Sequence, residues 1–233
     1  MISLQYRSNT KELLDRDDIP FPDIKRNMEE LNTINTLLGG HSITVKGFAI
    51  LAEDREKITV CEMGCGGGDN LVAIANWCRK NRIELYCIGI DIKKECIDVA
   101  KGQQQLNGKS EWIVADYEKV VFSEKPDIIF SSLFCHHFTN EALIKQLHWM
   151  RENSGIGFFI NDLHRNGLAY YSIRILTLLF SSSYLVKNDA PLSVARGFRS
   201  NEWIQLCKNA GIDHVKVEWQ WAFRYLILYA HGA

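Results

Sequence analysis

The sequence lacks an excess of charge of either sign. Its 27 lysine and arginine residues nearly balance its 28 aspartate and glutamate residues, which gives a formal net charge of −1. Surfaces that bind nucleic acids carry clustered positive charge that pairs with the phosphates. We therefore expect no nucleic-acid partner.

The sequence also lacks a cysteine pattern that would support disulfides or a zinc site. Its seven cysteines are odd in number, are scattered along the chain and form no Cys-x-x-Cys pair. No signal peptide is recognised ahead of them. Reduced thiols are typical of the cytoplasm, so we expect a cytoplasmic protein whose cysteines are free and buried.

No hydrophobic run is long enough for a transmembrane helix. The most apolar stretch, Leu168–Phe180, would form about three helical turns and carries Arg174 near its middle. A membrane span needs about 20 apolar residues. The stretch therefore predicts a buried helix or the roof of a ligand pocket, and a contact with the membrane surface is a third interpretation.

What the sequence does contain is a glycine-rich turn between an apolar strand and a helix. Glu62 ends the strand, and Gly64, Gly66 and Gly68 follow at alternate positions before the helix begins. Glycine is needed where the backbone takes a positive φ or where a ligand lies too close for a Cβ. A helix N-terminus after such a turn attracts negative groups through its free N–H groups.

Two further strands end in an acidic residue. Asp91 ends the second apolar run, and Asp116 follows the third. A carboxylate about 20 residues beyond a glycine-rich turn binds ribose hydroxyls in doubly wound nucleotide folds. Ligands of parallel sheets bind beyond the carboxyl ends of the strands, which is where the glycines and both acids are expected.

This combination resembles the motifs of the class I S-adenosylmethionine-dependent methyltransferases. The resemblance implies S-adenosylmethionine as cofactor and S-adenosylhomocysteine as product, with Asp91 on the ribose and Asp116 on the adenine amino group. The cofactor-binding residues that it implies are Glu62, Gly64, Cys65, Gly66, Gly68, Asp91, Ile92, Asp116, Tyr117 and Ser132.

A nicotinamide-dependent dehydrogenase is the natural alternative. Its fingerprint is Gly-x-Gly-x-x-Gly, but Asp69 stands where the third glycine would be. A carboxylate beside a pyrophosphate would be repelled, whereas S-adenosylmethionine carries a sulfonium and an ammonium group. The glycine turn therefore favours the methyltransferase.

The alternation of strands and helices predicts an α/β fold with right-handed crossovers. We expect a doubly wound, seven-stranded, mostly parallel sheet, the Rossmann-like methyltransferase fold, ending in an antiparallel hairpin. Two alternating runs near the C-terminus are joined too tightly for parallel strands. The predicted strands are 58–63, 84–90, 111–115, 127–132, 155–160, 215–221 and 223–229, and the predicted core helices are 69–81, 93–105, 140–152 and 202–210.

We divide the chain into an N-terminal part, residues 1–57, and a cofactor-binding core, residues 58–233, with a substrate-pocket insertion at 161–200. The N-terminal part is expected to hold an extended leader, residues 1–23, and a helical lid. Apolar residues at three- and four-residue spacing predict a helix from Asp23.

A second lid helix is expected to follow Gly39-Gly40, with Ser42 as its cap. One interpretation is that the two helices only pack against the edge of the sheet. As a lid, they would carry His41 or Arg26 toward the cofactor.

The turn after the fourth strand holds the first candidate catalytic residue. In the resembled family this position lies beside the transferring methyl group, and histidine suits proton transfer near neutral pH. We predict that His136 is the base and that His137 contacts substrate. The alternative is that one or both rings are structural.

The turn after the fifth strand holds a second candidate base, His164, with Asp162 positioned to orient it or to contact substrate. A surface role for this cluster is an equal alternative. The magnesium-dependent catechol type also needs an Asp after the fourth strand, where this chain has Ser131-Ser132. We therefore predict no metal.

The insertion is expected to supply the remaining substrate contacts, namely Tyr170, Tyr171, Ser193 and Arg196, the last two from a pocket-closing loop at 189–198. These segments resemble bacterial small-molecule methylases of the ubiquinone and menaquinone type, and others associated with polyketides. The reaction implied is methyl transfer to an oxygen, less often a carbon, of a small aromatic or lipophilic acceptor such as a phenol, quinol or polyketide.

Other acceptors and roles fit less well. Methylation of an amino group usually goes with Asn/Asp-Pro-Pro-Tyr/Phe after the fourth strand, and cytosine C5 methylation with Pro-Cys, and neither is present. A methyltransferase of macromolecules and a non-catalytic scaffold of the same fold are the remaining alternatives. Both a monomer and a homodimer remain open.

Overall fold

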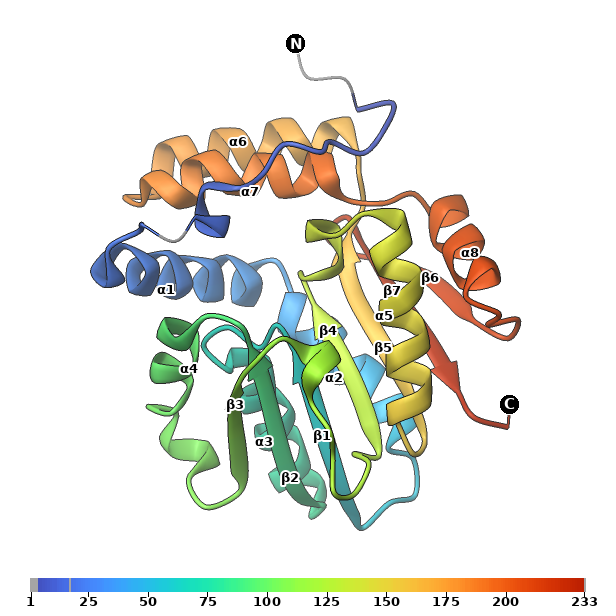
Figure 1. The fold of residues 1–233 in the computed structure, drawn as a ribbon. Helices are drawn as coiled ribbons and strands as arrows, with labels where there is room; N and C mark the ends of the chain where they lie inside the picture. Colours follow the sequence, from blue (N-terminus) through green and yellow to red (C-terminus); the bar gives the residue numbers. More distant parts are fainter. Residues whose placement is uncertain (1–3, 17, 233) are drawn as a thin grey trace.

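A seven-stranded sheet with the order β3-β2-β1-β4-β5-β7-β6 forms the centre of the computed structural model (Figure 1), which describes residues 4–16 and 18–232. Strands β1 to β5 are parallel, and β7 runs antiparallel to both β5 and β6. This confirms the predicted fold class. The strands are β1 (Lys57–Met63), β2 (Glu84–Asp91), β3 (Ser110–Val114), β4 (Ile128–Ser132), β5 (Gly157–Leu163), β6 (Lys216–Gln220) and β7 (Arg224–Ala230).

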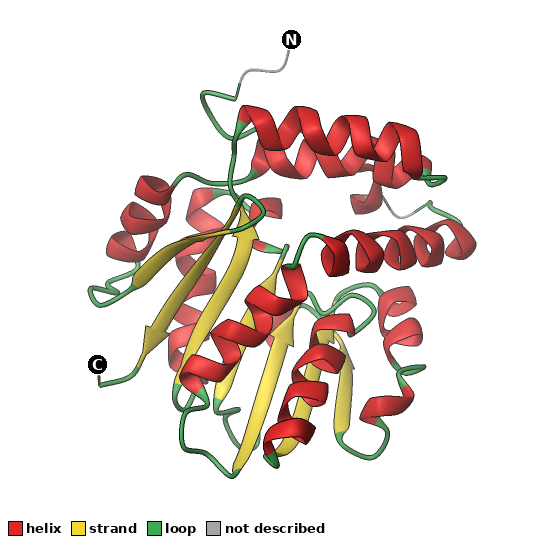
Figure 2. Cartoon of the chain, turned by 180° about the vertical axis from the view of Figure 1, so that it is seen from behind, coloured by secondary structure: helices red, strands yellow, loops and turns green. Residues whose placement is uncertain are grey.

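Helices cover both faces of the sheet and the edge at which the parallel strands end (Figures 1 and 2). Helices α2 and α3 pack on one face, and α5 and α8 on the other. The helices are α1 (Phe21–Leu37), α2 (Gly40–Leu51), α3 (Asp69–Asn81), α4 (Lys94–Ala100), α5 (Asn140–Asn153), α6 (Gly167–Phe180), α7 (Tyr184–Arg196) and α8 (Ser200–Asn209). Helices α1, α6 and α7 lie beyond the carboxyl ends of β1, β4 and β5 (Figure 1).

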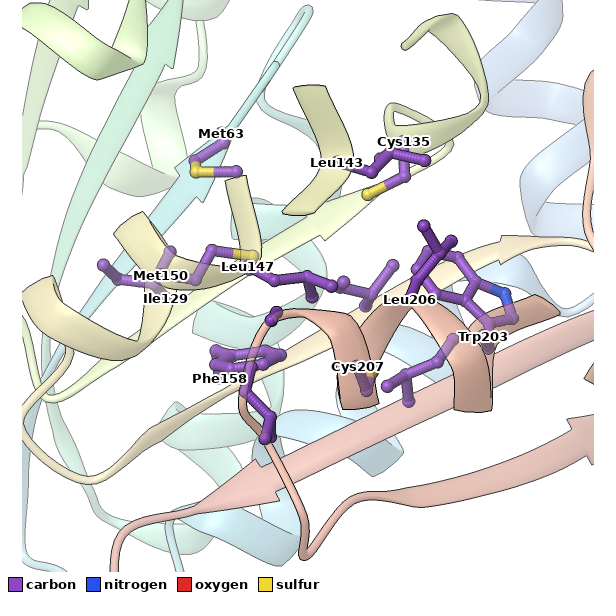
Figure 3. Close-up of a cluster of buried hydrophobic side chains, with 14 of the residues drawn as sticks. Met63, Ile129, Cys135, Leu143, Leu147, Met150, Phe158, Trp203, Leu206 and Cys207 are labelled. Carbon is purple, nitrogen blue, oxygen red and sulfur yellow. The ribbon is translucent and has the colours of Figure 1, made fainter. Parts of the chain in front are cut away.

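Alternation along the strands divides the core into two clusters, one on each face. In β1, Cys61 and Met63 belong to the cluster under α5 and α8, whereas Ile58 and Val60 belong to that under α2 and α3. Successive side chains of a strand point to opposite faces, so a strand buried on both sides is apolar throughout. Trp203 of α8 lies in the first cluster (Figure 3). The seven cysteines are free and buried, as predicted.

Several predicted boundaries were wrong. Strand β5 continues to Leu163, so Asn161 and Asp162 lie in the strand and not in a turn. The amide of Asn161 donates to the Gly40 carbonyl and to Thr44 Oγ1, at 3.0 and 3.1 Å. These partners from α2 satisfy the amide nitrogen of a buried strand residue, which the strand's own sequence does not show. The Oδ1 of Asn161 has no partner among the described residues.

Three helices also differ from their predictions. Helix α4 ends at Ala100, and α2 begins at Gly40, so Ser42 lies inside the first turn instead of capping it. The segment predicted as a pocket-closing loop is mostly helix α7, with Pro191 inside it. The spacing of its polar groups predicted a loop, but the helix continues through Pro191, which removes one intrahelical hydrogen bond.

The predicted leader is extended apart from one short 3-10 turn, η1 (Leu13–Asp15), and its residues 1–3 and 17 lie outside the described residues. Helix α6 is buried on one side only, where Ala169, Tyr170 and Thr177 face the protein. No helix within residues 4–16 and 18–232 combines the length and apolar character needed to cross a membrane.

Candidate active site

The glycine turn after β1 takes the backbone conformation that its sequence predicts. Gly64, Gly66 and Gly68 have φ values of 64°, 51° and 78°, in the left-handed region that favours glycine. A Cβ on Gly66 would meet nothing within 4 Å, whereas one on Gly64 would lie 2.2 Å from the ring of Phe134. Gly64 is therefore required for packing as well as for conformation, and Phe134 brings the turn after β4 against the glycine turn.

This difference predicts unequal effects of two alanine substitutions. Gly66→Ala should cost about 1–2 kcal/mol of stability, the penalty of a left-handed alanine. Gly64→Ala should cost about 1–3 kcal/mol more, because the Phe134 ring must move. Urea unfolding of the two variants beside the wild type measures both. Equal losses would show that Phe134 does not hold the turn.

Asp91 and Asp116 occupy the ends of neighbouring strands. The Asp91 carboxylate accepts hydrogen bonds from the backbone N–H groups of Gly66 and Lys93, at 3.0 and 2.9 Å. Burial raises the pKa of Asp91, and these bonds act against that rise. Asp116 accepts from the Glu118 N–H at 3.2 Å. Asp91 thus ties the end of β2 to the glycine turn, and each carboxylate keeps lone pairs for further donors.

Glu62 is buried beside the same turn and is only partly satisfied. Its Oε1 accepts from Asn70 Nδ2 at 2.8 Å, while Oε2 has no partner among the described residues. Burial raises the pKa of Glu62 well above its usual value. Asn70 contacts His41 at 2.9 Å, and the other ring nitrogen of His41 contacts Asn32 at 2.8 Å. Of the two lid residues considered, His41 therefore reaches the site, and Arg26 is exposed.

The other predicted cofactor residues lie around this edge of the sheet. The Cys65 N–H donates to the Ile90 carbonyl at 3.0 Å, and Ser132 Oγ accepts from Asn161 Nδ2 at 3.3 Å. Tyr117 is buried against Phe134 and Trp149, whereas 71% of Ile92 is exposed.

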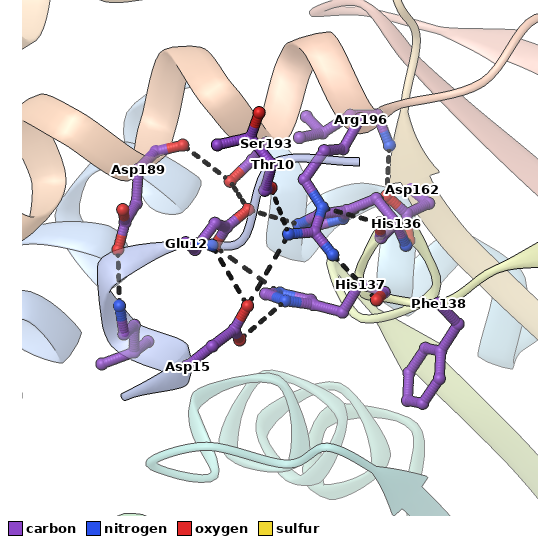
Figure 4. A network of polar contacts seen from close by, with 12 residues as sticks. Thr10, Glu12, Asp15, His136, His137, Phe138, Asp162, Asp189, Ser193 and Arg196 are labelled. Atoms are coloured by element: carbon purple, nitrogen blue, oxygen red, sulfur yellow. Dashed lines mark hydrogen bonds and ion pairs between the residues drawn. The ribbon is translucent and has the colours of Figure 1, made fainter. Parts of the chain in front are cut away.

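His136 lies in the 3-10 turn η4 (Cys135–His137) after β4 and is held from two sides (Figure 4). Its Nδ1 is 2.8 Å from Oδ1 of Asp162, and its Nε2 is 3.6 Å from Oε1 of Glu12. All three side chains are at most 5% exposed. The predicted Asp162 contact with a histidine is thus made with His136, and not with His164.

His137 has a matching arrangement. Its Nδ1 is 3.2 Å from Oδ1 of Asp15, and its Nε2 is 3.7 Å from Oε2 of Glu12. The side chain is 23% exposed, so it is the more accessible of the two rings. The centroids of the two imidazole rings are 4.4 Å apart.

The surrounding carboxylates determine the charge of His136. Burial lowers the pKa of the ring, but Asp162 and Glu12 outweigh burial and raise the pKa to about 9. In this arrangement the ring is protonated at neutral pH. A protonated ring cannot accept a proton. A role as base therefore requires that Glu12 move away, which would lower the pKa of the ring, or that another cation take the place of the proton.

Glu12 and Asp15 belong to an N-terminal strap (residues 4–16) that crosses over η4 and lies against α7. The Arg7 guanidinium donates to the carbonyl of Phe138 at 2.9 Å and stacks over the Phe198 ring. Asp189 of α7 accepts from the N–H groups of Leu13 and Leu14, at 2.8 and 3.0 Å.

Two predicted substrate contacts on α7 also hold this arrangement. Ser193 Oγ donates to Glu12 Oε1 at 2.7 Å. Arg196 donates to the carbonyls of Thr10, His136 and His137 at 2.8–3.0 Å (Figure 4). Each side chain therefore already binds the strap or the histidine turn.

The comparisons with known proteins agree with this geometry. Residues 60–155, which include the glycine turn, Asp91, Asp116 and both histidines of η4, match the model of a family described as a methyltransferase domain. Residues 60–155 therefore form an S-adenosylmethionine-dependent methyltransferase domain. No curated protein is similar enough in sequence to this methyltransferase to count as a relative.

Solved structures share the fold at low sequence identity. The plantazolicin methyltransferase BpumL with S-adenosylhomocysteine has a TM-score of 0.64 and 19% identity, over 84% of this chain and 74% of that one. Magnesium protoporphyrin IX methyltransferase from Synechocystis PCC 6803 with S-adenosylmethionine has a TM-score of 0.58 and 10% identity, over 92% of this chain and 99% of that one. Human N-acetylserotonin methyltransferase has a TM-score of 0.65 and 15% identity, over 97% of this chain and 64% of that one.

The residues of the methyltransferase fit the cofactor. Glu62 presents a buried, unpartnered carboxylate oxygen beside the glycine turn, which suits an ammonium group. Gly66 leaves open space where a Cβ would lie. S-adenosylmethionine, the cofactor of this domain, supplies a methyl group already activated by its sulfonium.

His164 lies apart from the His136 cluster. Its Nδ1 accepts from Trp219 Nε1 at 3.3 Å, and its ring packs edge to face with Tyr225. Burial, with the nearby Arg165 and Arg199, lowers the pKa of His164 and favours the neutral ring. Of the two tyrosines on α6, Tyr170 is buried and Tyr171 is 49% exposed.

No local sequence pattern indicated the role of the strap. Glu12 and Asp15 lie in a polar segment more than a hundred residues before the histidines that they contact. Arg224 was also missed: it is 3% exposed, and its Nε and one terminal nitrogen have no partner among the described residues. A charged residue inside an apolar strand is a signal that could have pointed to it.

Proposed function

We propose that this methyltransferase transfers the methyl group to an oxygen, less often a carbon, of a small aromatic or lipophilic acceptor such as a phenol, a quinol or a polyketide. The observation that carries the proposal is the buried contact between His136 and Asp162. The turn that holds His136 also packs against the glycine turn, through Phe134 and Gly64. Ubiquinone- and menaquinone-type precursors are within this acceptor class.

The chain's own residues would act mainly by positioning. Glu62, Asp91 and Asp116 would hold the amino group, the ribose and the adenine of the cofactor. Methyl transfer is an in-line displacement, so aligning the acceptor oxygen with the methyl group supplies much of the rate. A phenol with a pKa near 10 also benefits from losing its proton, which we assign to His136 or His164.

The acceptor would lie beneath the lid and the insertion. We propose that residues 1–57 and 161–200 enclose it, with contacts from His137, Asp162, Tyr170 and Tyr171. Ser193 and Arg196 would act on it through the strap and η4, which they hold. Similar structures are named for plantazolicin, protoporphyrin and N-acetylserotonin, and these small molecules support an acceptor of this size.

Incubation with labelled S-adenosylmethionine and panels of phenols, quinols and polyketides tests the proposal. We expect label in at least one panel, at an oxygen that mass spectrometry can locate. Micromolar binding of S-adenosylhomocysteine without any labelled small molecule, together with labelled RNA or protein from a lysate, would replace this acceptor class by a macromolecule.

Histidine variants test the proton-removing step. His136→Ala should lower kcat by about 100-fold or more while S-adenosylhomocysteine affinity stays unchanged. His164→Ala should lower kcat less, because its contacts lie on the β6–β7 hairpin. His214→Ala, an exposed site, is the control. A loss below about 10-fold in both variants would mean that alignment alone suffices.

A further inference from the structure

We infer that Glu12, His136 and His137 bind one divalent transition-metal ion of the class of zinc. One ligand atom from each side chain lies within 4.8 Å of the others. The sequence predicted no metal, because it was compared with a magnesium site that uses other positions. The three residues now come together from the strap and from η4.

The three side chains face one another but stand further apart than the ligands of a bound ion would. The Nε2 atoms of His136 and His137 face opposite oxygens of the same Glu12 carboxylate, at 3.6 and 3.7 Å. Zinc binds imidazole nitrogen at about 2.0–2.1 Å, which places tetrahedral ligand atoms roughly 3.3 Å apart. The two nitrogen–oxygen distances exceed that value by a few tenths of an ångström, and all three ligand atoms lie within 4.8 Å of one another. Binding an ion would therefore require the ligands to close by up to about 1.5 Å.

The second partners of the two rings support the inference independently. A histidine that binds a metal almost always donates its other ring N–H to a carboxylate, a carbonyl or water. Here Nδ1 of His136 faces Asp162 at 2.8 Å, and Nδ1 of His137 faces Asp15 at 3.2 Å (Figure 4). Both carboxylates favour a proton on Nδ1, and the lone pair of each Nε2 is then directed at Glu12.

The local charge also favours a cation. Glu12, Asp15 and Asp162 surround the two rings. Arg7 and Arg224 act on Asp162, and Arg196 lies 3.6 Å from Asp15. Glu12 forms no ion pair with a lysine or an arginine among the described residues, since its partners are the two imidazole rings. A divalent ion between Glu12 and the rings would supply that positive charge.

The donor set limits the kind of ion. Two imidazole nitrogens and one carboxylate suit zinc and neighbouring transition metals, whereas magnesium and calcium prefer oxygen ligands throughout. Three protein ligands leave a position open, as in catalytic zinc sites. If the proposed function holds, an acceptor hydroxyl could occupy that position, where the ion would lower its pKa and its proton would pass to solvent. His136 would then be a ligand and not the base. The binding of the ion does not depend on that function.

Calorimetric titration of the metal-free protein with Zn²⁺ tests the site. We expect one equivalent per chain in the wild type. Glu12→Gln and His137→Ala should each weaken binding by about 100-fold, and Asp15→Asn by about 10- to 100-fold, the usual effect of losing an outer partner of a ligand. His214→Ala, with an exposed histidine, should bind as the wild type does.

Absence of binding to the wild type, or equal affinity in all variants, would overturn the inference. Because seven free thiols offer another place for zinc, X-ray absorption at the zinc edge should show nitrogen and oxygen neighbours; sulfur neighbours would also overturn it. Thermal melts confirm that each variant is folded. S-adenosylhomocysteine binding and methylation of acceptors are measured separately, so failure of the proposed function would leave this result readable.

Discussion

Asp91→Ala is expected to weaken S-adenosylhomocysteine binding by at least about 100-fold, or ~2.7 kcal/mol. A hydrogen bond to a charged group contributes about 1.5–3 kcal/mol, and the variant would lose the proposed bonds to the ribose. It would also release the N–H of Gly66, so the glycine turn would be held to β2 by the Cys65 N–H bond to the Ile90 carbonyl alone. Calorimetric titration measures the change directly.

Glu84→Ala is the matched control, since Glu84 begins the strand that Asp91 ends and forms an exposed ion pair with Lys57. Exposed pairs contribute little, so this variant should bind like the wild type. Retention of tight binding by Asp91→Ala would mean that the ribose is held elsewhere. Loss of binding in both variants would point to a general weakening of β2.

Trp203→Ala is expected to lower the free energy of unfolding by about 3–5 kcal/mol. The side chain is fully buried, and its ring lies 4.1 Å from that of Phe198. Removing it would leave a cavity between α8 and the sheet, in the cluster that Figure 3 shows. Chemical denaturation followed by circular dichroism measures the loss.

Two companion variants separate the causes of that loss. Ile204→Ala changes the next residue of α8, which is 56% exposed, and should alter stability by less than about 1 kcal/mol. Trp203→Phe should cost less than Trp203→Ala, because it fills part of the space and removes an indole N–H that is buried without a partner among the described residues. If Ile204→Ala cost as much as Trp203→Ala, burial of the indole in this cluster would not explain the effect. Helix propensity could not explain it either, because alanine is the best helix former.

Local sequence patterns predicted the cofactor half of the site. Gly64, Gly66 and Gly68 mark left-handed backbone, and Asp91 ends an apolar strand. Both are features of a few consecutive residues, and the parallel topology then brings the strand ends to one edge. The mostly parallel sheet followed from the alternation of strands and helices, and its antiparallel end from the tight β6–β7 connection. The order of the strands was not predicted and comes from the structure.

The part of the site that we assign to the acceptor depends on contacts between distant segments, which local sequence patterns do not show. Asn161 and Asp162 looked like turn residues because polar side chains rarely occupy a buried strand. They are tolerated because Gly40, Thr44 and His136 supply hydrogen-bond partners from distant segments. The site roles predicted for His136 and His164 stay predictions, although the structure places the two rings in different surroundings.

The strap also has a consequence for how the chain is made. Arg7 and Glu12 leave the ribosome early, but their partners Ser193 and Arg196 follow some 180 residues later. At about 5–20 residues per second, the strap waits on the order of ten seconds or more before η4 and α7 exist. The strap is therefore synthesised well before the segments that hold it, and it docks late. Glu12 and Asp15 can take their full set of contacts only after α7 has been made.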